Sequence, residues 1–425
     1  MIELVKNILT ETEDVSAYEI VKSHNDERQL YYVGKKLETN RAVSTQNITV
    51  RVYSDFDEKR GSSSFTIIAS DDEASIRDKA KETVNKAKAA GNKWYPLPEK
   101  SGNINTSFKP ENDLNTIALS VADAIFEADD FDGGQLNATE IFVSLKHHTF
   151  VNSNGVEHEY DTLSAEFETI PSYDAGEEKV ELYDFCILKD TDPEKIKAHI
   201  REELKYAKMR AEAKRVQELD IPENIPVVIS GEGVATILHE LADDSSYRNV
   251  YQHMNHFELG SKVSESSFTM KMTGGNNDGF PSGPIDGSGI VKKSRTVIEN
   301  SVITSLWGDM RFGYYMGEKD VTGELKCIEI EAEGTDSFLE EPHIEVCKFS
   351  APQIEWDAGY FGGEVRLALY FDGENYTPVS GFSISGNVYD LLNGVVFSKE
   401  KGEYNSKYSG CVGPKYWKLT GMTIN

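Results

Sequence analysis

A histidine and three carboxylates close the stretch VVISGEGVATILHELADD, which spans residues 227–244. His239 and Glu240 come first, and Asp243 and Asp244 follow. Imidazole and carboxylate groups both bind zinc in proteins, and a glutamate beside such ligands can act as a general base. These residue types therefore suggest metal-assisted hydrolysis, provided that the helix brings them to one ion.

The spacing along a helix decides which of these side chains can share a metal. Each helical residue advances by about 100°, so His239 and Asp243 lie on one face, about 40° apart. This is the spacing of the two ligands in a His-Glu-x-x-His helix. Asp244 lies about 140° from His239 and can join it only where the helix ends or bends. Both geometries remain open.

A second interpretation needs no metal. The same residues could form the exposed end of a helix, where carboxylates are mildly unfavourable because the helix dipole is negative there. Arg248 is the nearest basic residue downstream and could relieve this repulsion. Of the other histidines, His253 and His256 are expected on a surface loop. His147 and His148 are neighbours on an expected strand, so their side chains point to opposite faces and cannot easily share an ion.

Composition limits the classes of function. The chain has 72 acidic and 44 basic residues and a net charge of −28. Such a surface repels nucleic acid and anionic membranes, so neither is expected as a partner. No apolar run approaches the length of a membrane span, and the N-terminus does not resemble a secretory signal, so a cytoplasmic protein is expected. The widely spaced cysteines form neither a disulfide framework nor a zinc ribbon, and most are expected to be core thiols; they are Cys186, Cys327, Cys347 and Cys411.

The elements that must position the candidate residues suggest an α+β chain of two domains. Residues 1–220 are expected to form antiparallel strands with helices, including a hairpin at Asn152–Gly155. Residues 221–425 are expected to be mostly β, curled on themselves, with one helix that carries His239 and a long loop at 274–289. Helices of the first domain are expected at 72–91, at 112–129 with Asn112 or Asp113 as its cap, and at 192–219.

The order of several motifs resembles the TldD/PmbA (TldD/TldE) family, once described as modulators of DNA gyrase. NSNGVEHEY is similar to a hairpin in the first domain of that family, and GEGVATILHELADD is similar to its strand, turn and helix bearing His-Glu-x-x-x-His. GPIDGSGIVKKSRTVIENSVI, FSISGNV and SGCVGPKYWKLTGMTIN resemble later segments in the same order. The resemblance covers essentially the whole chain.

The resemblance implies a zinc-dependent peptidase. His239 matches the first zinc ligand, Glu240 the catalytic base and Cys411 the thiolate ligand, while the second histidine falls on Asp244. The family implies a hollow dimer, with itself or with a sibling subunit, that degrades extended, unfolded peptides and removes leader peptides. The family's alternative is a catalytically inactive TldE/PmbA-like partner that completes the dimer cavity. The aspartate at position 244 leaves both roles open, because a carboxylate lowers the Lewis acidity of zinc and can change metal preference.

Overall fold

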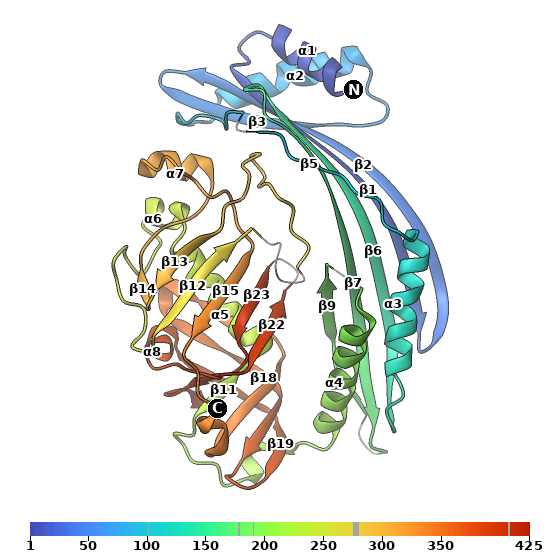
Figure 1. Ribbon diagram of the computed structural model, residues 1–425, viewed down its shortest axis with the longest axis vertical. Helices are drawn as coiled ribbons and strands as arrows, with labels where there is room; N and C mark the ends of the chain where they lie inside the picture. The colour runs from blue at the N-terminus through green and yellow to red at the C-terminus, as the bar shows by residue number, and fades with distance from the viewer. Residues whose placement is uncertain (101, 177–178, 190, 275–279, 407–408) are drawn as a thin grey trace.

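The computed structural model describes residues 1–425 apart from 101, 177–178, 190, 275–279 and 407–408. Among the described residues the strands form three sheets, with helices packed against them, so the chain is mixed α+β as predicted (Figure 1). Within the same residues, no helix combines the length and apolar character needed to cross a membrane. Part of the predicted loop at 274–289 lies outside the described residues.

The first sheet, called the N-terminal sheet, has the strand order β4-β3-β2-β1-β6-β7-β5, with β8 and β9 paired to β7. Its long central strands pair antiparallel and bow over the rest of the chain with their concave side inward (Figure 1). The strands are β1 Ala17–Val33, β2 Lys36–Phe56, β3 Lys59–Ile67, β4 Gly91–Lys93, β5 Asn105–Thr106, β6 Gly134–Asn152, β7 Glu157–Asp174, β8 Lys179–Glu181 and β9 Asp184–Leu188.

The expected hairpin joins β6 to β7. The side chain of Asn152 accepts hydrogen bonds from the backbone N–H groups of Asn154 and Val156, at 2.9 and 3.0 Å. Gly155 takes a φ of +81°, which a side chain would strain. The local Asn-Gly chemistry therefore closes the turn as predicted.

Helices α1 Ile2–Glu11, α2 Glu73–Lys88, α3 Leu114–Ala128 and α4 Pro193–Ala211 accompany this sheet. The predicted α2 is confirmed, and Asp113 is the cap of α3, with its carboxylate accepting from two backbone N–H groups. The prediction that the next helix runs to residue 219 was wrong. After Ala211 the chain leaves the helix, and β10 Lys214–Arg215 pairs with a distant strand before the short 3-10 helix η1 Val216–Glu218. Pairing with another part of the chain overrides the helical pattern there.

Two further sheets follow. The large C-terminal sheet has the order β10-β19-β18-β16-β11-β24-β21, with β17 and β20 on β18 and β25 on β20. The small C-terminal sheet has the order β14-β13-β12-β15-β23-β22. The strands are β11 Val227–Ile229, β12 Phe268–Thr273, β13 Arg295–Glu299, β14 Val302–Ile303, β15 Cys327–Ala332, β16 His343–Phe349, β17 Gln353–Glu355, β18 Tyr360–Phe371, β19 Tyr376–Ser380, β20 Phe382–Asn387, β21 Val396–Phe397, β22 Lys401–Asn405, β23 Gly410–Pro414, β24 Trp417–Leu419 and β25 Thr423–Ile424.

The prediction that the second half curls on itself was wrong. Its described strands form two separate sheets. Each sheet is open, because the first and last strands of its order do not pair with each other within the described residues. The second half also has more helical segments than predicted, namely α5 Gly231–Asp244, α6 Tyr247–Gln252, α7 Met310–Met316, α8 Val388–Asn393, η2 Ser337–Glu340 and η3 Trp356–Ala358. Helix α5 contacts strands of both sheets, so its apolar side chains are buried between two sheets. The predicted domain boundary between residues 220 and 221 stays a prediction.

Helix α5, which carries the candidate residues, lies between the two C-terminal sheets. It contacts β16 and β17 of the large sheet and β22 and β23 of the small sheet. Its buried apolar side chains include Val234, Ile237, Leu238 and Leu241, whose spacing places them on one stripe of the helix. The helix therefore packs into the core along this stripe, while Glu232, Thr236 and the last turns bring polar groups towards the surface.

Candidate functional site

The last two turns of α5 present the predicted site residues to different surroundings. His239, Glu240 and Asp243 are partly exposed, whereas the side chain of Asp244 is fully buried. The helix ends at Asp244, and Ser245 caps it. Asp244 therefore points into the protein, away from the partly exposed groups that precede it in the sequence.

The carboxylate of Asp244 is fully engaged by N–H donors. Its Oδ1 accepts from the backbone N–H of His256 at 2.5 Å and from the indole Nε1 of Trp356 at 2.6 Å. Its Oδ2 accepts from the backbone N–H of Phe257 at 3.0 Å. Burial raises the pKa of Asp244, and these three donors oppose the rise. The carboxylate is an internal hydrogen-bond acceptor that links residues 256–257 and the short helix η3 to the end of α5.

Aromatic rings surround this acceptor. The exposed ring of His256 stacks on Tyr389, with centroids 3.5 Å apart and planes 8° apart. Phe257 and Trp356 each meet Tyr389 edge to face. His256 is thus on a surface loop, as expected, and its ring packs on an aromatic neighbour.

The partly exposed carboxylates of α5 influence one another. Burial raises the pKa of Glu240, and the nearby charges of Asp243, Asp357 and Asp244 raise it further. Burial also raises the pKa of Asp243, while His239 and Arg248 oppose that rise. The end of α5 is therefore an acidic region that favours protons or another cation.

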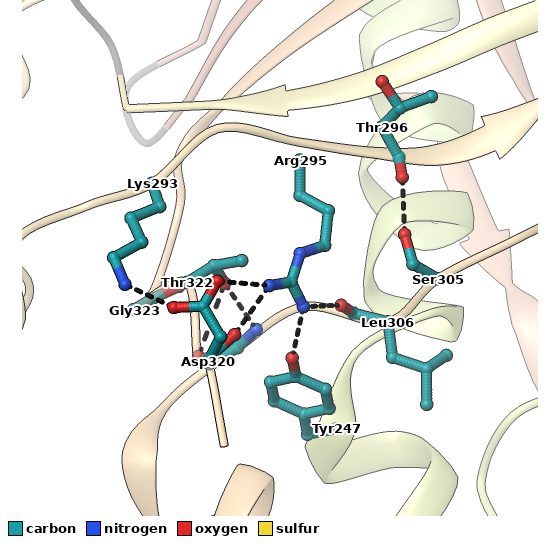
Figure 2. A network of polar contacts seen from close by, with 10 residues as sticks. Tyr247, Lys293, Arg295, Thr296, Ser305, Leu306, Asp320, Thr322 and Gly323 are labelled. Atoms are coloured by element: carbon teal, nitrogen blue, oxygen red, sulfur yellow. Dashed lines mark hydrogen bonds and ion pairs between the residues drawn. The ribbon is translucent and has the colours of Figure 1, made fainter. Parts of the chain in front are cut away.

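A network around Arg295 holds the segment that follows α5 (Figure 2). Its guanidinium donates to the Tyr247 hydroxyl at 2.7 Å and to the Leu306 carbonyl at 3.0 Å. It also donates to the Asp320 carbonyl at 2.6 Å, and Lys293 pairs with the Asp320 carboxylate. These contacts anchor Tyr247 of α6 to β13, close in sequence to the end of α5.

Cys411 lies elsewhere in the core. It is fully buried on β23, opposite Ile328 of β15 and Tyr404 of β22. Within the described part of the chain, no set of three His, Cys, Asp or Glu side chains that includes Cys411 or His239 brings its ligand atoms within 4.8 Å of one another. The predicted set of His239, Asp244 and Cys411 is therefore not brought together as a three-ligand centre.

The residues present do not fit the zinc site that the family resemblance implies. A catalytic zinc ordinarily has three protein ligands and an open position. Here the acceptor atoms of Asp244 already serve three N–H donors, and no third ligand completes a set with His239 and Cys411 among the described residues. Whether these residues bind a metal in solution stays a prediction.

The structure brings together a different group that the sequence interpretation missed. Asp184 of β9 and His199 and Glu203 of α4 have ligand atoms within 4.8 Å of one another, and this group could hold a metal. His199 Nε2 lies 2.7 Å from Asp184 Oδ2. His199 and Glu203 are four residues apart on a helix, the spacing applied above to His239 and Asp243, so that pattern was available as a signal.

A lysine already supplies a cation to this group. Lys348 of β16 places its Nζ 2.6 Å from Glu203 Oε1 and 3.4 Å from Asp184 Oδ1. Burial and the charge of Asp184 raise the pKa of Glu203 to about 7. Despite burial, His199 and Lys348 hold the pKa of Asp184 at about 2. The cluster joins α4 and β9 to β16. Its structural role is therefore a buried ionic link between the N-terminal sheet and the large C-terminal sheet.

Comparisons with known proteins agree with this fold. Residues 222–425 match the family described as PmbA/TldA metallopeptidase C-terminal domain. No curated protein matches the chain.

Solved structures resemble the whole chain. TldE from Thermococcus kodakarensis is 16% identical, with a TM-score of 0.79 over 99% of both chains. A proposed DNA gyrase modulator from Thermotoga maritima is 14% identical, with a TM-score of 0.78 over 100% of this chain and 99% of that chain. Another proposed DNA gyrase modulator, from Bacteroides thetaiotaomicron, is 14% identical, with a TM-score of 0.76 over 100% of this chain and 98% of that chain. At these identities the likeness concerns the fold. Residues 222–425 thus match the C-terminal domain of the PmbA/TldA metallopeptidases, and the full chain shares the fold of these solved structures.

Proposed function

We propose that this chain is a non-catalytic subunit of the TldD/PmbA family. It would act as a TldE/PmbA-like partner that encloses extended peptides in a dimer and leaves hydrolysis to a sibling chain. The observation that carries the proposal is the engagement of Asp244. A carboxylate that accepts three N–H bonds in the core contributes to packing and would have to give up those bonds to bind an ion.

Cys411 supports the same proposal. It is fully buried in a sheet, and a buried thiol in such a place commonly packs as a small apolar side chain. In this role the His-Glu helix is a remnant of an active site. Its present contribution is to fill the space between two sheets.

The zinc peptidase is the second candidate, and one observation favours it. The pKa of the half-buried Glu240 is raised by burial and by neighbouring carboxylates. A raised pKa suits a general base that works near neutral pH. In that role His239, Cys411 and either Asp243 or Asp244 would have to rearrange to bind zinc.

Metal content and peptide cleavage, measured on one preparation of the full chain, test the proposal. We expect the purified chain to contain no stoichiometric zinc. We also expect any cleavage of an unfolded peptide to be the same in Glu240→Gln as in the parent. Stoichiometric zinc that disappears in His239→Ala and Cys411→Ala, together with cleavage that needs Glu240, would establish the peptidase instead. Native mass, alone and with a sibling family subunit, tests whether the dimer forms with itself or with that subunit.

A further inference from the structure

A cavity of about 720 Å³ lies between the N-terminal sheet and the second half of the chain. Strands β6 and β7 form one wall on the concave side of the sheet. Much of the other wall comes from residues 280–292, named the cavity loop. The position of this loop against the sheet therefore decides how open the cavity is.

The cavity loop packs closely against aromatic side chains of the sheet. Gly289 has a φ of +85°, and a Cβ atom there would lie 2.1 Å from the ring of Phe150. A Cβ atom at Gly283 would lie 2.5 Å from the ring of Tyr160. Ile285 is buried in one cluster with Phe150 and Tyr160. Because only glycine permits the approach at residue 289, the backbone of the loop itself reaches the sheet there.

His158 of β7 joins the sheet to this point of the loop. It is only 1% exposed, and both ring nitrogens have backbone partners. Nδ1 accepts from the backbone N–H of Ile104 at 3.0 Å. Nε2 lies 3.1 Å from the carbonyl oxygen of Gly289, which can only accept, so Nε2 carries the ring proton and donates it. The two partners therefore require a neutral imidazole with its proton on Nε2.

A second proton on the ring would break this arrangement. Protonated Nδ1 would point its N–H at the N–H of Ile104, and two donors cannot form a hydrogen bond. Burial also disfavours the charged ring and lowers the pKa of His158 below its ordinary value of 6.5, against a smaller opposing effect of the Gly289 carbonyl. The bonds to Ile104 and Gly289 therefore exist together only while the ring is neutral.

Several other ionisable groups lie on the elements around His158. Among the described residues, none of them forms a hydrogen bond or an ion pair with its imidazole. They are Glu19 of β1, Lys146 and His148 of β6, Tyr160 of β7, Glu99 and Lys100 of the segment before Ile104, Asp286 and Lys292 of the cavity loop, and Glu324. Protonation of His158 therefore acts first on its two backbone bonds.

We propose that His158 is an acid-sensitive latch for the cavity. The neutral ring holds the cavity loop against β7, and protonation releases the loop and widens the opening between the two walls. This role goes beyond the proposed function and depends on neither zinc nor hydrolysis. Because the pKa of the latched ring is lowered, the stability that the latch contributes is fully present above about pH 6.5 and is lost as pH falls through that lowered value.

Hydrogen exchange of the full chain, measured between about pH 7.5 and 5 and corrected for the pH dependence of chemical exchange, tests the latch. We expect the protection of the Ile104 amide and of residues 285–291 to fall by up to about tenfold per pH unit below about 6.5. The Ile104 amide is the decisive probe, since it donates to Nδ1 itself. Asp286 accepts from the amides of residues 288, 290 and 324, so its own titration would loosen the loop and leave Ile104 protected.

His158→Gln assigns the effect to this ring. A glutamine side chain can accept at one atom and donate at another without titrating, so protection should stay the same over this pH range. His148→Gln is the matched control, because His148 lines the same cavity, and it should keep the pH dependence of the parent. Protection that falls equally in His158→Gln, or that no longer falls in His148→Gln, would overturn the latch.

An NMR titration of the His158 ring in the parent chain needs no variant. We expect a midpoint below 6.5, with the loss of Ile104 protection over the same pH range. A midpoint at or above the ordinary value, or loop protection that does not change with pH, would also overturn the proposal. Metal content and cleavage test the proposed function separately, so either one can fail alone.

Discussion

The indole Nε1 of Trp356 donates a hydrogen bond of 2.6 Å to Oδ1 of Asp244, across 112 residues of the chain. Trp356 begins the short helix η3, and Asp244 ends α5. The two backbone donors at His256 and Phe257 complete the same acceptor. Asp244, where the resemblance implies a zinc ligand, is thus part of the packing between three segments.

Trp356→Phe removes the indole donor and retains an aromatic ring. We expect a loss of about 1.5–3 kcal/mol in the free energy of unfolding, because a buried carboxylate loses one of three hydrogen bonds. Chemical denaturation measures the loss. Trp94→Phe is the control, since its indole donates to Asp55 in an exposed pair that Arg60 also holds. A similar loss in both variants would contradict the role given to Asp244.

Asp244→His restores the residue type that the family resemblance places there. We expect no gain of zinc and a loss of about 2–5 kcal/mol in stability, because an imidazole cannot accept from three N–H donors. Metal analysis and thermal melting measure the two quantities. Stoichiometric zinc in Asp244→His would mean that this one substitution separates the chain from an active site.

Lys348→Met leaves two buried carboxyl groups without their ammonium partner. We expect a loss of about 3–5 kcal/mol, since removing one member of a buried ion pair exposes the other to an apolar environment. Lys418→Met is the control, because Lys418 pairs with Glu341, which is 61% exposed, and it should lose less than about 1 kcal/mol. Urea denaturation at neutral pH compares them, and losses of equal size would refute a special role for Lys348.

A divalent cation should partly rescue the same variant. Without Lys348, the group of Asp184, His199 and Glu203 has room for another cation. We expect added zinc to raise the melting temperature of Lys348→Met more than that of the parent chain, because binding to the folded state stabilises it. Equal shifts of the melting temperature in both proteins would mean that zinc binds somewhere other than at Asp184, His199 and Glu203.

The raised pKa of Glu203 predicts how stability changes with pH. Glu203 titrates near 7 when folded, against an ordinary value of 4.5, so the folded chain holds more protons between these values. The stability that protonated Glu203 contributes to the folded state is fully present below pH 4.5 and is lost as pH rises through 7. Between pH 5 and 8, the free energy of unfolding of Glu203→Gln should therefore fall by about 1–3 kcal/mol less than that of the parent. Parallel stability curves for the two proteins over this window would contradict the assignment.

The sequence alone was sufficient where contacts are local. The 3.6-residue spacing and the terminal cap predicted α2 and α3, because those signals act within one or two turns. The Asn-Gly turn after Asn152 was predicted for the same reason. The order of the motifs along the chain was also sufficient to indicate the family.

The tertiary structure decided everything that depends on distant segments. It ended α4 at Ala211 through the pairing of β10 with β19, and it divided the second half into two sheets. It gave Asp244 its partners from residues 256, 257 and 356, and it joined α4 to Lys348.

The physical reason is the range of the interactions involved. Capping, turn formation and helical periodicity involve residues a few positions apart, so the sequence determines them directly. The hydrogen bonds of a buried carboxylate and the ion pairs of a buried lysine depend on which segments meet after folding. The sequence by itself therefore determined the helix that carries His239 and Glu240, whereas only the tertiary structure decided that Asp244 serves the core.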